Sequence, residues 1–113
     1  MRLDHVQVAA PAGCEPEARR FYGELLGLTE VEKPAALRAA GGAWFPPVHV
    51  GVEEPFAPAR RAHPALRVDA GQLDALAARL AAAGCSVEWD ESIPGVRRFF
   101  TFDPWGNRVE LLA

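Results

Sequence analysis

The same order of secondary structure is predicted twice along this 113-residue chain: a strand, then a helix, then short strands. Residues 3–9 alternate between apolar and polar side chains, as a strand with one buried face does. Apolar side chains then recur every three or four residues from Ala18 to Leu26, which is typical of a helix lying on a sheet. Near His63 the pattern begins again. The two halves share this pattern but little sequence identity, so we expect two structurally related modules.

The first helix has clear ends, whereas the strands predicted after it are short. Pro16 suits the first helical turn, and Gly27 is expected to end the helix. The strands predicted next cover residues 28–32, 37–40, 43–45 and 48–53. Gly41-Gly42 is expected to form the turn of a hairpin between the second and third of these strands. Pro46-Pro47 is expected to force a bend or an edge position.

The second half repeats the pattern and ends in a hairpin. Alternation over residues 63–68 predicts a strand, and apolar spacing over 71–83 predicts a helix that Gly84 closes. The remaining predicted strands cover residues 86–89, 99–102 and 108–112. The turn-forming residues of the sequence DPWGN separate the last two runs, which predicts that they form a hairpin.

These elements predict an α+β fold in which two helices cover one face of the sheet. The chain is long enough for a proper core but leaves little room for a second domain. We therefore expect a single domain over residues 1–113. Within it, module one spans about 1–54, a connection about 55–62, and module two about 63–113.

Four groups able to bind a metal ion fall on the same side of the predicted strands, opposite the face that the helices cover. They are His5, His49, His63 and Glu110, and the chain holds no other histidine. Three nitrogen ligands and one oxygen ligand suit Zn, Ni, Co, Fe or Mn better than Mg or Ca. Strand histidines are more often core or surface residues than ligands, and a lone strand carboxylate typically faces solvent. Because the spacing is not local, periodicity alone does not show that the four groups converge.

Composition and charge argue against several classes of function. A formal net charge of −3 argues against a nucleic-acid surface, and Arg60-Arg61 and Arg97-Arg98 are too short to form basic patches. No apolar run approaches membrane-spanning length, and we expect no signal peptide before the first strand. Cys14 and Cys85 lack CxxC spacing and are expected to be reduced. We therefore expect a cytoplasmic protein that binds neither nucleic acid nor membrane.

Five segments together resemble the vicinal oxygen chelate superfamily, which includes glyoxalase I, methylmalonyl-CoA epimerase, extradiol dioxygenases and the fosfomycin- and bleomycin-resistance proteins. In order along the chain they are LDHVQV, FYGELLGL, HVGV, AHPALRV and FFTFDPWGNRVELL. The resemblance covers essentially the whole chain. It implies two βαβββ modules whose curved mixed sheet forms a cup around a metal, with the helices on the convex face.

The resemblance also implies roles for individual residues. His5 and His63 match the first-strand ligands of the two modules, and Glu110 matches the last-strand ligand. His49 departs from the pattern, because glyoxalase I-like members carry Glu there and epimerase-like members carry Gln. Members that hold a metal bind two vicinal substrate oxygens and stabilise an enolate or similar anion. A carboxylate, here Glu110, is the catalytic base expected to move the proton.

Three more side chains share the strand parity of these expected ligands. They are Gln7, Arg67 and Arg108, and we expect them either to hold a polar or anionic substrate or to lie in water at the rim. We therefore predict a metal-dependent lyase or isomerase that acts on a small oxygenated molecule. A small extradiol-type dioxygenase is one alternative.

Aromatic residues support another alternative and a prediction about assembly. A metal-free protein would bind an aromatic or drug-like ligand in a cup lined partly by Trp44, Phe45 and Trp105. We also expect a homodimer, because short strands in two half-sheets leave exposed edges that proteins usually cover or pair. Trp44, Phe45 and Phe56 are large apolar groups beside prolines that a partner chain would cover, unless they form the floor of the cup.

Overall fold

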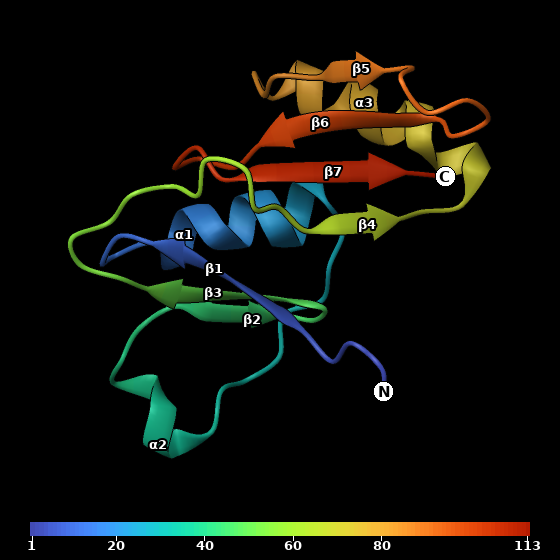
Figure 1. Cartoon of the computed structure of the whole chain (residues 1–113). Coiled ribbons are helices and arrows are strands. Elements are labelled where there is room, and N and C mark those ends of the chain that lie inside the picture. The colour runs from blue at the N-terminus through green and yellow to red at the C-terminus, as the bar shows by residue number, and fades with distance from the viewer. The chain divides into compact units, whose positions relative to one another are not determined.

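The computed structural model describes all 113 residues, and the chain divides into two compact units, Met1–Pro58 (unit 1) and Ala59–Ala113 (unit 2). Each unit contains helical segments and one mixed β-sheet, three-stranded in unit 1 and four-stranded in unit 2 (Figure 1). The predicted α+β fold, built from two modules with similar element orders, is confirmed.

Unit 1 begins with a strand and a helical segment, and its remaining strands follow. Its elements are β1 (Val6–Ala10), α1 (Glu15–Ala18), η1 (Arg19–Leu25), α2 (Ala35–Arg38), β2 (Ala43–Phe45) and β3 (Val48–Val52). The strand order is β1-β3-β2, with β1 parallel and β2 antiparallel to β3. This register places Gln7 and Trp44 beside His49, on the side of the sheet opposite Val48 and Val50.

The first helix of unit 1 follows its predicted bounds closely. Pro16 lies in its first turn, and Gly27, at φ +78°, follows its end. Residues 19–25 adopt a π-helical hydrogen-bond pattern that the apolar spacing did not predict. The helix packs on the sheet of its own unit, because the buried Tyr22 ring stacks on the buried Phe45 ring with centroids 6.0 Å apart.

The predicted hairpin around Gly41-Gly42 is wrong. Residues 35–38 form the helix α2 instead of part of a strand, because Pro34 starts the turn and the next four residues are all strong helix formers. Pro46-Pro47, joined by a cis peptide, forms the turn between β2 and β3. The strand predicted over 28–32 is reduced to one isolated bridge between Val31 and Trp44.

Unit 2 repeats the order with one more strand in its sheet. Its elements are β4 (Ala65–Arg67), η2 (Ala70–Gln72), α3 (Leu73–Ala82), β5 (Glu88–Asp90), β6 (Arg98–Phe102) and β7 (Arg108–Leu112). The strand order is β4-β7-β6-β5, with β4 parallel to β7 and the other pairs antiparallel. Figure 1 shows α3 behind β5 and β6. The predicted terminal hairpin is confirmed nearly to the residue.

The core of unit 2 lies between α3 and one face of its sheet. Leu73 and Leu80 are fully buried on the helix, and Phe99, Val109 and Leu111 are buried on the strands. These three strand residues alternate with the side chains of the opposite face, where Phe100 and Glu110 lie directly across from each other. No helix of the structure is both long and apolar enough to cross a membrane.

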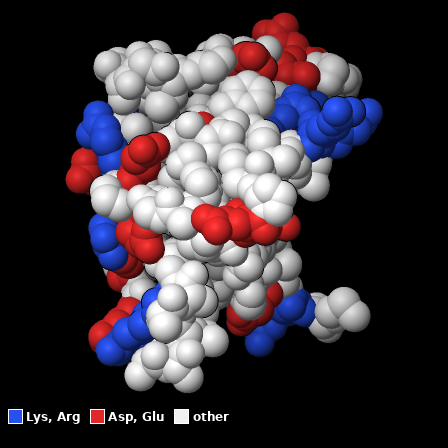
Figure 2. All heavy atoms as spheres, turned by 90° about the vertical axis from the view of Figure 1, so that its left-hand side faces the viewer, with Lys and Arg blue, Asp and Glu red and all other residues white.

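Surface charges of both signs are mixed. On the face drawn in Figure 2, Lys and Arg side chains lie among Asp and Glu side chains and do not merge into one basic surface. Five of the arginines form ion pairs with a carboxylate: Arg19, Arg20, Arg38, Arg97 and Arg98.

Candidate functional site

Unit 2 brings two of the predicted ligands into direct contact. Glu110 lies in the middle of β7, opposite Ala65 of β4, and His63 is two residues before that partner. The Glu110 backbone N–H donates to the Pro64 carbonyl over 2.9 Å, which holds the two segments together. As a result, His63 Nε2 lies 3.1 Å from Glu110 Oε2, although 47 residues separate them in sequence. The Glu110 side chain is only 9% exposed.

The hydrogen bond on the other side of the His63 ring sets its tautomer. Nδ1 lies 2.8 Å from the Arg61 carbonyl oxygen, and a carbonyl can only accept, so Nδ1 carries the proton. In the neutral ring Nε2 is then an acceptor, and it faces an acceptor oxygen of Glu110. Two facing acceptors require a proton or a cation between them.

The spacing of these two acceptors suits a shared metal ion. Metal–ligand bonds of ~2.1 Å place neighbouring ligand atoms about 3.0 Å apart at a right angle and about 3.4 Å apart in a tetrahedron. The observed separation of 3.1 Å falls within that range. A metal-binding histidine commonly donates its other N–H to a backbone carbonyl, as His63 does. The pair therefore fits as two ligands of a transition metal.

Cationic and aromatic groups surround this pair within unit 2. Arg98 donates from Nη1 to Glu110 Oε1 over 3.0 Å. The Arg108 guanidinium lies over the Phe100 ring at 3.7 Å, and the His63 ring meets the same ring edge-on at 5.6 Å. The register places Arg67 across from Leu112, on the face that carries Glu110. This face is thus rich in groups that favour an anion.

Unit 1 stacks the other two histidines together with a tryptophan. The rings of His5 and His49 are 4.0 Å apart and inclined by 15°, and the rings of Trp44 and His49 are 4.2 Å apart and inclined by 5°. His5 Nδ1 lies 2.7 Å from Asp4 Oδ2, so Nδ1 donates and Nε2 is left as the acceptor. His49 is 7% exposed, and burial lowers its pKa, helped by the neighbouring His5.

The stacking affects how these imidazoles can bind. Nitrogen lone pairs lie in the plane of the ring, so two nearly parallel rings do not direct their lone pairs at one nearby ion. No three His, Cys, Asp or Glu side chains gather closely enough to hold a metal. His5 and His49 therefore stay predictions as ligands, and the pair in unit 2 is the part that the structure assembles.

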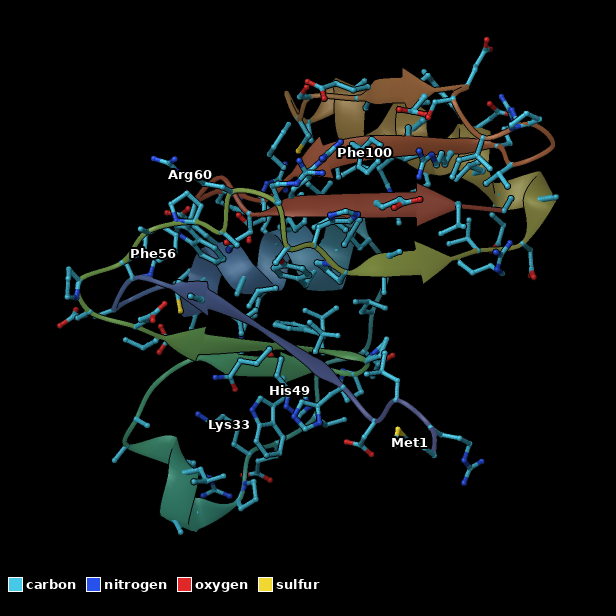
Figure 3. The ribbon with its side chains drawn as sticks, viewed as in Figure 1. Met1, Lys33, His49, Phe56, Arg60 and Phe100 are labelled. Carbon is cyan, nitrogen blue, oxygen red and sulfur yellow. The ribbon has the colours of Figure 1, made fainter.

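Gln7 and Lys33 lie beside this stack. The Gln7 side chain crosses Gly51 so closely that a Cβ at Gly51 would come within 2.5 Å of Gln7 Nε2. Both residues line a small cavity of about 180 Å³ together with Trp44. Lys33 Nζ donates to the Gly41 carbonyl, and Figure 3 shows Lys33 and His49 on the same side of the sheet. Sequence reasoning missed Lys33, which follows no strand parity.

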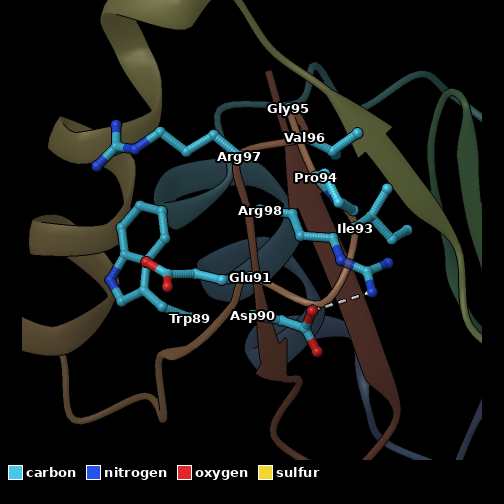
Figure 4. A pocket seen from close by; sticks show the side chains of 9 residues that line it. All are labelled: Trp89, Asp90, Glu91, Ile93, Pro94, Gly95, Val96, Arg97 and Arg98. Carbon is cyan, nitrogen blue, oxygen red and sulfur yellow. Dashed lines mark hydrogen bonds and ion pairs between the residues drawn. The ribbon is translucent and has the colours of Figure 1, made fainter.

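Arg98 is the other site residue that sequence reasoning missed. It lines a hollow of about 680 Å³ formed by β5, the start of β6 and the loop between them (Figure 4). Read from the sequence, Arg97-Arg98 was only a short basic pair. The usable signal was parity, because Arg98 lies two residues before Phe100 on the same face of β6.

Comparisons with known proteins identify the family. Residues 8–112 match the glyoxalase-like domain family, whereas no curated protein matches the chain. A Bacillus anthracis protein assigned to the glyoxalase family has 47% identity and a TM-score of 0.92, over 99% of this chain and 93% of that one. The match to a glyoxalase/dioxygenase from Nostoc punctiforme has 20% identity and a TM-score of 0.76, covering 98% and 89%.

A more distant neighbour has the same fold. The fosfomycin resistance protein FosX from Listeria monocytogenes has 14% identity and a TM-score of 0.74, over all of this chain and 93% of that one. At such low identity the likeness concerns the fold alone. The family match over nearly the whole chain and the 47% identical relative decide the assignment. The chain is a member of the glyoxalase-like domain family, within the vicinal oxygen chelate superfamily.

Proposed function

We propose that this protein is a metal-dependent lyase or isomerase of the glyoxalase-like type, acting on a small molecule with two neighbouring oxygens. One observation carries the proposal: a buried carboxylate oxygen of Glu110 and the Nε2 atom of His63 face each other at 3.1 Å, while the Arg61 carbonyl engages His63 Nδ1. A carboxylate oxygen and an imidazole nitrogen held in this way are placed as two ligands of one divalent ion.

The proposed ligands are His63 and Glu110, joined by His5 on the strength of the resemblance. His49 stays a ligand predicted from the sequence alone, because its ring is stacked on that of His5. The Asp4–His5 hydrogen bond supports His5 as a ligand, because it engages Nδ1 and leaves Nε2 available. Nitrogen and carboxylate ligands suit Zn, Ni, Co, Fe or Mn. When bound, such an ion supplies Lewis acidity that lowers the energy of negative charge developing on substrate oxygens.

The side chains around the pair have separate proposed roles. Glu110 is the proposed proton acceptor, with its Oε1 engaged by Arg98. The Arg108 guanidinium lies on Phe100 and has no carboxylate within ion-pair distance in its unit, so its N–H groups are available to an anionic substrate. Arg67 and Gln7 are proposed to bind further polar groups of the substrate. The cytoplasm remains the compartment predicted from the sequence.

Two alternatives keep specific support. A metal-free binding protein is favoured by the flat aromatic surface of Trp44, which stacks on His49 and lines the small cavity of unit 1. An extradiol-type dioxygenase is suggested by the description of the Nostoc punctiforme neighbour as a glyoxalase/dioxygenase. The metal-free alternative leaves the facing acceptors of His63 and Glu110 without an ion between them, whereas a dioxygenase would hold a metal there as well.

Metal analysis of protein purified without an affinity tag tests the proposal. We expect a stoichiometric transition metal in the wild type. His63→Ala and Glu110→Gln should each weaken metal affinity by at least ~100-fold, because each removes a direct ligand. Glu24→Gln, which removes an exposed carboxylate that pairs only with Arg20, should leave affinity unchanged. A folded wild type that takes up no transition metal even after reconstitution would reject the metalloenzyme in favour of the binding protein.

A further inference from the structure

Arg98 connects the Glu110 carboxylate to a second anion on the neighbouring strand. Its Nη1 donates to Glu110 Oε1 over 3.0 Å, and its Nη2 donates to Asp90 Oδ1 over 3.1 Å. Nη2 also lies 3.2 Å from Ser92 Oγ. The Arg98 side chain is 14% exposed, so this bridge is mostly shielded from water. One guanidinium therefore spans three polar groups at once, which its planar fork allows.

The strand register explains why these groups meet. Asp90 lies directly across from Arg98 in the β5–β6 pair, and Phe100 lies directly across from Glu110 in the β6–β7 pair. Arg98 and Phe100 are two residues apart and share a face, so Arg98 reaches diagonally to Glu110. The contact thus depends on rigid strands rather than on a loop.

Asp90 is well suited to hold the far end of the bridge. The Ser92 hydroxyl and backbone N–H both donate to Asp90 Oδ1, over 2.6 and 2.9 Å. These bonds, together with Arg98, lower the pKa of Asp90 to about 2. Asp90 therefore stays ionised at any pH at which the protein would work. Figure 4 shows the Asp90–Arg98 interaction at the edge of the hollow.

The near end of the bridge determines how Glu110 is presented. Arg98 engages Oε1, so Oε2 is the oxygen that faces His63 Nε2. Without the guanidinium, the carboxylate could rotate about its last side-chain bond. Arg98 therefore fixes which oxygen of Glu110 faces His63.

We propose that Arg98 is a positioning residue that holds Glu110 in the orientation needed to share a metal with His63. This inference rests on the proposed metal-dependent function. It assigns Arg98 no contact with the ion or the substrate. Its effect is to fix one carboxylate oxygen, and Asp90 and Ser92 fix Arg98 in turn.

Cobalt(II) titration of tag-free, metal-stripped protein tests the proposal. Arg98→Met should weaken cobalt affinity by ~10–100-fold, the usual effect of losing a residue that orients a ligand, and should alter the visible cobalt absorption spectrum. Arg98→Lys keeps the positive charge but loses the two-pronged guanidinium. Its cobalt affinity should therefore lie between those of the wild type and Arg98→Met. Wild-type affinity and an unchanged spectrum in Arg98→Met would overturn the proposal.

Arg97 offers a matched control one position away. Its guanidinium makes a two-bond ion pair with the exposed Asp74 and lies 4.7 Å over Trp89, so it has no contact with Glu110. Arg97→Met removes the same charge from the same segment and should change cobalt affinity by less than ~2-fold. An equal loss in both variants would show a general charge effect and would contradict positioning.

A second measurement separates this inference from the proposed function. If the wild type binds no cobalt, the metal proposal fails. Urea unfolding of the metal-free protein then still tests whether Arg98 and Glu110 interact. Arg98→Met, Glu110→Gln and the double variant form a cycle in which we expect a coupling of ~5–10-fold in the folding equilibrium constant. Additive effects within ~2-fold would overturn the link between the two residues. Arg98→Lys replaces Arg98→Met in the cycle if the methionine variant does not fold.

Discussion

One histidine in each unit, His5 or His63, has its Nδ1 atom engaged by an acceptor oxygen. In His63 a backbone carbonyl engages Nδ1, and in His5 the Asp4 carboxylate engages Nδ1. Each bond fixes the tautomer, so the neutral ring presents Nε2 as the acceptor. Both residues lie just before the first strand of their unit, whereas the alternating pattern predicted them on those strands, because each strand starts later than predicted. Equivalent preparation at equivalent places supports a common role for the two residues.

A single glycine should show how tightly the site-bearing sheet of unit 1 is packed. Gly42 has φ +84°, and a Cβ there would overlap the Val50 carbonyl of β3. Gly42→Ala should therefore lower the free energy of unfolding by roughly 2–4 kcal/mol, measured by urea denaturation.

Gly13 is the control for backbone strain alone. Its φ of +79° is similar, but a Cβ there would meet nothing within 4 Å. Gly13→Ala should cost only about 1 kcal/mol. Equal losses in the two variants would mean that the close approach to β3 contributes nothing.

At the scale of elements, the paired strands of unit 1 bury an ionisable ring. β1, β2 and β3 bring His5, Trp44 and His49 into one stack, and burial lowers the pKa of His49 below its ordinary value of 6.5. The folded chain therefore holds His49 neutral at a pH at which the unfolded chain already protonates it.

This difference predicts a pH-dependent stability. The contribution of His49 is fully present above pH 6.5 and is lost as the pH falls from 6.5 toward the lowered folded pKa, because only the unfolded state then gains the proton. Urea unfolding from pH 7.5 downward should show this loss in the wild type, and His49→Gln should show less of it. An identical pH profile in the two proteins would contradict the assignment.

At the scale of the whole molecule, the sheets leave edges that a partner chain could use. The outer strands are β1 and β2 in unit 1 and β4 and β5 in unit 2. Leu3 and Leu37 are exposed apolar residues, whereas Phe45, one of the aromatic residues cited for a dimer, is fully buried inside unit 1. The case for a partner therefore rests on the edges and on Trp44 and Phe56, which are only partly covered.

We propose that the protein is a homodimer. Light scattering at micromolar concentration should give twice the mass of the chain, because unpaired edges favour association through a two-fold axis. Dilution should leave that mass unchanged if the interface is a stable one. A chain mass of one copy at every concentration would refute the dimer.

Local chemistry made some elements readable from the sequence. The terminal hairpin was predicted nearly to the residue, because alternation and the DPWGN turn both act over a few neighbouring positions. The helix that Gly27 ends was readable for the same reason. A bend at Pro46-Pro47 was expected, but the hairpin turn was wrongly placed at Gly41-Gly42, because that pair is the stronger hairpin signal and the helix formers before it were read as a strand.

The sequence by itself determined the two-module pattern, the family resemblance and the strand face that carries Glu110. Only the tertiary structure decided that His63 and Glu110 meet, because β4 and β7 pair in parallel and no local turn fixes that register. It also decided that Arg98 holds Glu110, since a diagonal contact across β6 and β7 depends on that register and not on spacing along the chain. The sequence gives the chemistry of each side chain, but strand pairing decides whether two side chains 47 residues apart come into contact.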